Sequence, residues 1–283
     1  MTFSIVARQG SSYGVAVASK FLAVGAVVPQ ARLEVGAVAT QAYAKVSYLA
    51  DVLWLLELGV SAAEAVERVT GADEGRAQRQ LGVVAADGQA TFTGPECDDW
   101  AGGVAGEVVE DAETTRYAVQ GNILAGEQVV TAMEAAFLTA AGQPLSRRLV
   151  AALLAGDAAG GDSRGRQSAA LVVTSPGAGY DESGVEVDLR IDDHPDAPTE
   201  LLRLLDLNDL YFGQPQDLQP LDPQLEAEVT ARLATLGHTA ADVNAALAKW
   251  SGMENYELLL VPGHIDGRVL QKLREAAAGV DVG

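Results

Sequence analysis

The sequence has few of the features that define several common classes of protein. Its 283 residues include a single cysteine, Cys97, so a disulfide framework is excluded. Basic residues are scarce, because 19 lysines and arginines stand against 39 aspartates and glutamates, for a formal net charge of −20. Such a surface repels nucleic-acid phosphates and anionic lipid headgroups. We therefore expect neither a nucleic-acid partner nor a membrane partner.

Long hydrophobic runs are also missing. The apolar stretch at residues 21–28 is interrupted by Gly25 and is too short to span a bilayer. The first residues lack the basic head and apolar core of a signal peptide. With the single cysteine, which suits a reducing compartment, this predicts a cytoplasmic protein. The chain does contain 48% apolar and 20% charged residues, a composition typical of a globular protein.

Residue patterns predict strands and pairs of helices in alternation. Leucines at helical spacing predict a helix that ends at Gly59, and a capping box at residues 61–64 begins a second helix. The pair Asp87-Gly88 predicts a hairpin turn. The predicted strands cover residues 3–8, 13–19, 35–40, 81–86, 89–93, 116–119, 168–174 and 185–191, and the later helices cover residues 128–140, 144–155 and 198–207.

This order of elements predicts a mixed α+β fold. Two helix pairs that each need a sheet to cover predict a four-layer αββα sandwich over residues 1–213, because the simple βαβ alternation of a doubly wound sheet is missing. Three prolines within residues 214–223 predict a linker. Residues 224–283 have the spacing of a small C-terminal helical module, with Asp266 as the cap of its last helix.

Five segments together form a recognisable set of motifs: Phe3 to Arg8, Val15 to Lys20, Val35 to Gln41, Gly161 to Ala170 and Asp192 to Pro195. They resemble a bacterial family known as domain of unknown function 1028, and the resemblance covers about the first three quarters of the chain. The family is similar to N-terminal nucleophile (Ntn) hydrolases, which hold two stacked sheets between helix layers and begin their first strand at the nucleophile. The tail, with Leu236-Gly237 and residues 250–255, is similar to a peptidoglycan-binding domain that some members carry.

Thr2 is the nucleophile that this resemblance implies. A threonine hydroxyl needs a base, and removal of Met1 leaves the α-amine of Thr2 beside its own hydroxyl. The pKa of an α-amine is about 7.7–8.0, close to the operating pH at which a general base is most effective. We expect Met1 to be removed, as initiator methionine normally is before so small a residue. The alternative is that Thr2 is merely a common second residue.

The resemblance also implies a cation near the third strand and a donor for the developing oxyanion. Lys20 and Arg32 are the candidate cations, and each is equally well explained as a solvated surface charge. Arg32 acts only electrostatically, because arginine keeps its proton. The backbone of Gln41 or Ala42 is the expected oxyanion donor. The Gln41 side chain either binds substrate through its amide or, as that of a residue at a strand end, has its hydrogen bonds satisfied by the backbone.

Residues 161–168 form a loop that resembles the one where threonine-type hydrolases orient their nucleophile with an Asp and a Ser. Asp162 and Ser168 are the corresponding residues, although their spacing differs. Arg164 and Arg166 are candidates for binding a substrate carboxylate, because a guanidinium fork binds carboxylate through two hydrogen bonds. The alternative is an internal ion pair with Asp162. Asn122 is a further substrate-binding candidate, which turn chemistry explains equally well.

No metal and no cofactor are predicted. His194, His238 and His264 lie far apart in the sequence, and neither zinc-ligand spacings nor phosphate-binding glycine loops occur. The sequence predicts a hydrolase of amide or peptide-type bonds in a small, carboxylate-bearing substrate. The alternative is a non-catalytic ligand-binding protein on the same fold, whose tail recognises cell-wall-derived fragments or a partner. By analogy with the fold, we expect a homo-oligomer.

Overall fold

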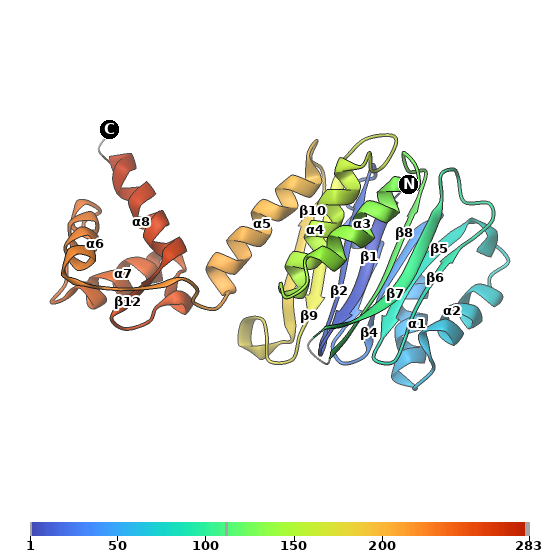
Figure 1. Ribbon diagram of the computed structural model, residues 1–283, viewed down its shortest axis with the longest axis horizontal. Coiled ribbons are helices and arrows are strands. Elements are labelled where there is room, and N and C mark those ends of the chain that lie inside the picture. Colours follow the sequence, from blue (N-terminus) through green and yellow to red (C-terminus); the bar gives the residue numbers. More distant parts are fainter. Residues whose placement is uncertain (1, 111–112, 281–283) are drawn as a thin grey trace. The chain divides into compact units, whose positions relative to one another are not determined.

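The computed structural model describes residues 2–110 and 113–280 (Figure 1). The chain divides into two compact units, Met1–Leu204 and Leu205–Gly283. The division falls within helix α5 (Ala197–Phe212) rather than at the predicted residue 213. The physical reason is that Leu210, on the last turn of α5, is buried in the hydrophobic core of the second unit. Among the described helices, none is long and apolar enough to cross a bilayer.

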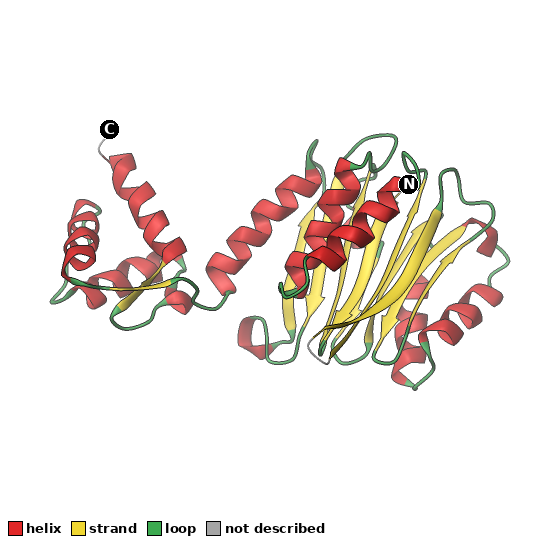
Figure 2. Cartoon of the chain, viewed as in Figure 1, coloured by secondary structure: helices red, strands yellow, loops and turns green. Residues whose placement is uncertain are grey.

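Two antiparallel sheets build the first unit (Figure 2). One sheet has six strands in the order β10-β9-β2-β1-β8-β7, and the other has four in the order β3-β4-β5-β6. The mixed α+β class is therefore confirmed. The strands are β1 (Thr2–Gln9), β2 (Ser12–Ser19), β3 (Pro29–Arg32), β4 (Gly36–Ala42), β5 (Arg79–Ala85), β6 (Gln89–Thr93), β7 (Gly102–Glu110), β8 (Glu113–Asn122), β9 (Ser168–Thr174) and β10 (Val185–Ile191).

Alternation of side chains along β1 explains why the two sheets stack. Val6 belongs to a buried cluster with Ala37 and Ala39 of β4 and Val84 of β5. Successive side chains of a strand point to opposite faces, so the even-numbered residues of β1 face the second sheet. Phe3, an odd-numbered residue, packs instead near Gly156 of α4 (Leu145–Ala158). The nucleophile candidate Thr2 therefore faces the space between the sheets.

Helices cover the outer face of each sheet. Helices α3 (Gln128–Thr139) and α4 lie over the six-stranded sheet, whereas α1 (Ser47–Glu57) and α2 (Ala62–Gly71) pack on the four-stranded sheet (Figure 1). Ser61 caps α2 by accepting the backbone N–H of Glu64, as predicted. The Glu64 carboxylate pairs with Arg68. Short 3-10 turns occur at Val24–Ala26, Arg76–Gln78, Tyr180–Glu182 and Glu257–Leu259.

Strand β7 was missed from the sequence because it is rich in glycine. Gly106 lies opposite Tyr117 of β8, and a Cβ at Gly106 would stand 2.5 Å from the Tyr117 hydroxyl. Glycine is required at this position so that the tyrosine ring can cross the neighbouring strand. A residue that usually weakens strands thus marks a close contact within this one.

The second unit is a helical module with a core of its own. Helices α6 (Pro223–Thr235), α7 (Val243–Glu254) and α8 (Gly267–Val280) bury Leu233 and Trp250 with the other members of that core. Strands β11 (Leu218–Pro220) and β12 (His264–Asp266) form a two-stranded ribbon. The predicted linker at residues 214–223 therefore contains β11 and the N-cap of α6. A proline is tolerated there because the ribbon has only edge strands.

Candidate functional site

A row of polar side chains lies at the end of the six-stranded sheet that contains Thr2. Thr2 lies opposite Asn122 of β8, and Ser19 of β2 lies opposite Ser168 of β9. Thr2 Oγ1 and Ser19 Oγ are 3.1 Å apart, which joins the two pairs into one row across four strands. All four side chains are buried. Residues directly opposite in an antiparallel sheet share a face, so the row faces the second sheet.

Amide side chains from both sheets hold the main chain of Thr2. Gln41 Nε2 donates to the Thr2 carbonyl oxygen at 3.1 Å and to Gln80 Oε1 at 2.7 Å. Asn122 Nδ2 donates to the same Gln80 oxygen at 2.9 Å and lies 3.5 Å from the Thr2 carbonyl oxygen. All three amides are buried. Buried amides that are bonded to one another have little freedom to move, so they fix the position of Thr2.

The same network continues along β1 and β8. Ser4 Oγ donates to Gln41 Oε1 at 2.6 Å, and Gln120 Nε2 donates to Ser4 Oγ at 2.6 Å. Gly82 of β5 makes room for this amide, because a Cβ there would lie 2.1 Å from Gln120 Oε1. Sequence reasoning missed Ser19, Gln80 and Gln120. The signal that could have found the glutamines is a polar residue on a strand face that is otherwise apolar.

The Gln41 side chain is therefore part of the core of the site rather than a substrate ligand. The structure supports the second interpretation of Gln41, a residue at a strand end whose amide group is fully hydrogen-bonded within the fold. Its partners are side chains as well as backbone carbonyls. Ala42, which follows it, has a φ of 68°, in the left-handed region. The chain turns sharply here and presents Ala42 to a cavity.

Asp162 and Ser168 hold the segment that follows Ser19. Asp162 Oδ2 accepts the backbone N–H of Lys20 at 2.7 Å, and Oδ1 accepts the backbone N–H of Arg164 at 2.9 Å. Ser168 Oγ donates to the carbonyl of Phe21 and accepts the backbone N–H of Val24 at 3.1 Å. Hydrogen bonds from both side chains thus anchor the backbone of residues 20–24, next to the polar row.

The two candidate cations lie in different places. Lys20 directly follows Ser19, and its Nζ donates to the Arg166 carbonyl at 3.3 Å. Arg32 pairs with Glu57 of α1 at 2.9 Å and lies opposite Gly36, at the start of β4. The residue of β4 that contacts Thr2 is Gln41, near the other end of the strand. At 3.3 Å per residue, Gln41 lies about 16 Å along β4 from Gly36. The structure thus contradicts the placement of Arg32 beside Thr2, because Arg32 lies at the opposite end of β4. There it forms a partly exposed ion pair with Glu57.

A cavity of about 220 Å³ adjoins the Thr2 end of the sheets. Asn122, which lies opposite Thr2, is part of its wall, and Arg164 and Asp98 bring charges of opposite sign. Ile123 has a φ of 51°, an uncommon conformation for a β-branched residue and one that often marks functional sites. Burial raises the pKa of the Cys97 thiol, which disfavours the nucleophilic thiolate. The wall consists of Ala42, Tyr43, Cys97, Asp98, Asn122, Ile123 and Arg164.

The two loop arginines have separate roles. Arg166 Nε donates to Asp157 of α4 at 2.6 Å, and this hydrogen bond is the main cause that raises the pKa of Arg166. Arg166 therefore forms an internal ion pair with Asp157. The internal pair with Asp162, which is the alternative for this loop, is formed by Arg164. Arg164 pairs with Asp162 at 3.2 Å and also lines the cavity. Of the two loop arginines, Arg164 is the one that lines the cavity.

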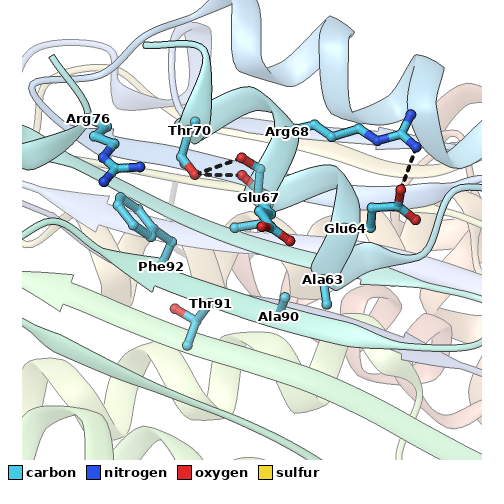
Figure 3. Close-up of a pocket in the computed structure, with 11 residues that line it drawn as sticks. Ala63, Glu64, Glu67, Arg68, Thr70, Arg76, Ala90, Thr91 and Phe92 are labelled. Atoms are coloured by element: carbon cyan, nitrogen blue, oxygen red, sulfur yellow. Dashed lines mark hydrogen bonds and ion pairs between the residues drawn. The ribbon is translucent and has the colours of Figure 1, made fainter. Parts of the chain in front are cut away.

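A larger groove, of about 770 Å³, lies between α2 and β6 (Figure 3). Some of its polar groups are engaged within α2: Arg68 pairs with Glu64, and Thr70 Oγ1 donates to the carbonyl of Val66 at 2.8 Å. Neither Thr2 nor any member of its polar row lines this groove. We therefore place the candidate site at the smaller cavity, because Asn122 of the polar row is part of its wall.

The fold and this polar strand end define a mixed α+β protein with a candidate site at the start of its first strand. The chain belongs to the family of unknown function DUF1028, whose model matches residues 2–201. It is similar to a crystal structure of a protein of that family from Silicibacter pomeroyi, with 35% identity and a TM-score of 0.63 over 74% of this chain and 89% of that one. A search of curated proteins finds no match.

Proposed function

We propose that the chain is an Ntn hydrolase that cleaves an amide or peptide-type bond with Thr2 as its nucleophile. The observation that carries the proposal is the position of the Thr2 hydroxyl, which begins β1, faces the space between the sheets and lies 3.1 Å from Ser19 Oγ. The arrangement of two stacked sheets with helices on their outer faces also supports the four-layer Ntn sandwich.

The proposed chemistry begins when removal of Met1 leaves a free α-amine on Thr2. The Thr2 hydroxyl proton passes to this amine while Oγ1 attacks the substrate carbonyl carbon. The Ala42 backbone N–H, at the cavity wall, is the proposed donor to the oxyanion. Collapse breaks the C–N bond, and the leaving amine takes the proton from the α-ammonium. Water then hydrolyses the ester on Thr2 and releases a carboxylic acid.

Residues around Thr2 contribute by positioning. Gln41 and Asn122 hold the Thr2 carbonyl, which limits the conformations that the first residue of β1 adopts. Ser19 Oγ exchanges a hydrogen bond with the nucleophile and selects one rotamer of its side chain. Lys20 follows Ser19 in the sequence and remains the proposed cation of the site.

The cavity supports a small substrate that carries a carboxylate. A volume of about 220 Å³ is below the usual range for drug-sized ligands. Arg164, oriented by Asp162, provides the guanidinium that binds a carboxylate. We propose in addition that the second unit is a peptidoglycan-binding-like module for cell-wall-derived fragments, which its separate hydrophobic core supports. Assembly into a homo-oligomer remains a proposal by analogy with the fold.

A screen of small amide substrates with matched variants tests the nucleophile. Thr2→Ala is expected to abolish turnover, and Thr2→Ser is expected to retain part of it. The control is Ser12→Ala, because Ser12 Oγ forms a similar hydroxyl pair with Ser175 Oγ at 2.7 Å, at the other end of β2. Saturable ligand binding without turnover, unchanged in Thr2→Ala, would instead support a non-catalytic binding protein. The cavity and Arg164 serve that alternative equally well.

A further inference from the structure

A second polar cavity lies at the end of β1 that is remote from Thr2. Its volume is about 400 Å³, and its wall includes two arginines, Arg8 and Arg116. Arg8 is six residues along β1 from Thr2, a distance of roughly 20 Å in a strand. The wall is completed by Gly10, Ser11, Glu113 and Thr114. This cavity is therefore separate from the one beside Thr2.

The two arginines are direct partners across β1 and β8. Like charges directly opposite one another destabilise a strand pair, and this chain has only 19 basic residues to place. Arg116 is offset by Glu107, whose Oε2 lies 3.2 Å from its Nη2. The Arg8 guanidinium carbon lies 5.9 Å from the centre of the Tyr13 ring. Contact with an aromatic face leaves the N–H edge of a guanidinium open to another partner.

Both arginines also carry a buried donor without a partner. Within residues 2–110 and 113–280, the Nε atoms of Arg8 and Arg116 are buried and make no hydrogen bond. A buried donor of this kind destabilises the fold unless a ligand or water accepts its proton. Nε forms one side of the fork through which arginine binds the paired oxygens of an oxyanion. The hydroxyls of Ser11 and Thr114, in the same wall, add two further donors.

We propose that this cavity binds a small oxyanion, held by Arg8 and Arg116 with the two hydroxyls. The chemistry fits phosphate, sulfate or a carboxylate, because each presents two or more acceptor oxygens. Glu113 lines the same cavity and opposes an anion, whereas Glu107 is already paired with Arg116. The charge of Glu113 therefore lowers the affinity that the two arginines provide. The site is independent of the hydrolase proposed at Thr2.

Calorimetric titration of the full chain with inorganic phosphate, at constant ionic strength, tests the proposal. We expect saturable binding of one phosphate per chain, weakened at least tenfold in Arg8→Gln and in Arg116→Gln. The matched control is Arg190→Gln, because Arg190 is an exposed arginine of β10 that pairs with Asp188. No saturable heat, or an equal loss in Arg190→Gln and Arg8→Gln, would overturn the site.

Glu113→Gln keeps the test decisive if the arginine variants do not fold. Removing the carboxylate that opposes the anion is expected to tighten phosphate binding several-fold. If Glu113 were instead the internal counter-ion of Arg8, this variant would lower the melting temperature without phosphate and leave the affinity for phosphate no tighter. That result would contradict the proposal.

Discussion

Thr2 Oγ1 and Ser19 Oγ lie 3.1 Å apart on neighbouring strands, and both residues are buried at the end of the six-stranded sheet. In the proposed mechanism this contact orients the nucleophile, so Ser19→Ala is expected to lower kcat about 10–100-fold with little change in KM. Steady-state kinetics on the substrate found in the amide screen measures both constants. The Ser12→Ala variant should keep both, and an equal effect in the two variants would contradict a positioning role for Ser19.

Gln80 joins the amides of both sheets, since its Oε1 accepts hydrogen bonds from Gln41 and Asn122. Gln80→Leu leaves these donors buried without that acceptor. The expected cost is about 1–3 kcal/mol for each buried group left unsatisfied. Urea unfolding, followed by circular dichroism, measures it.

The control for Gln80→Leu is Gln128→Leu, because Gln128 Nε2 makes an exposed contact with the Ala159 carbonyl. We expect this exposed substitution to change the free energy of unfolding by less than about 0.5 kcal/mol. Equal losses of stability in the two variants would show that the buried network does not stabilise the junction of the sheets.

Gly82→Ala tests the close packing between the sheets. A Cβ at Gly82 lies 2.1 Å from Gln120 Oε1, so the amide has to move and its bond to Ser4 is disturbed. The expected loss of stability is about 1–3 kcal/mol. Gly71→Ala is the control, because a Cβ there, at the end of α2, meets nothing within 4 Å. A Gly82→Ala variant as stable as its parent would contradict the close contact.

Acid should weaken the second unit through Glu228. Hydrogen bonds from Arg274, and then from Arg232, lower the pKa of this carboxyl from 4.5 to about 2. A pKa that is lower in the folded state adds stability above the unfolded value, and that stability is lost as the pH falls from about 4.5 toward 2. Glu228→Gln should therefore be less stable than the parent at pH 7, with the difference disappearing near pH 2.

Fluorescence of Trp250, which is buried in the core of the second unit, provides a local signal for this comparison when Trp54 and Trp100 of the first unit are replaced by phenylalanine. Glu226→Gln is the control, because Glu226 lies in the first turn of the same helix and is not part of the ion pairs that join Glu228 to Arg232 and Arg274. A stability difference between Glu228→Gln and its parent that persists unchanged to pH 2 would contradict the linkage.

The sequence predicted the elements whose signals are local. Ser61 caps α2, and Asp266 accepts the backbone N–H of Arg268 at the start of α8. These predictions hold because capping depends on residues only two or three positions apart. Strand β7 was missed, because the close contact that requires glycine at Gly106 comes from Tyr117 on another strand.

The candidate site depends on contacts that cross the fold, which is why only part of it was predicted. Thr2 was identified through a family resemblance, whereas Ser19 becomes visible as its partner only when the register of β1 and β2 is known. The prediction that Arg32 lies near Thr2 was wrong for the same reason. Its partner Glu57 lies on α1, which packs on the four-stranded sheet, and the sequence does not reveal this contact. The sequence gives the order of residues along a strand, but it does not show which end of that strand packs against Thr2.

The proposed nucleophile requires Thr2 to be the first residue of the mature chain. Intact mass, together with N-terminal sequencing of the protein made in bacteria, measures this directly. We expect a chain that begins at Thr2, with an α-amine beside the hydroxyl. A chain that retains Met1 would place the amine one residue too far from the hydroxyl, and would contradict the proposed nucleophile and base.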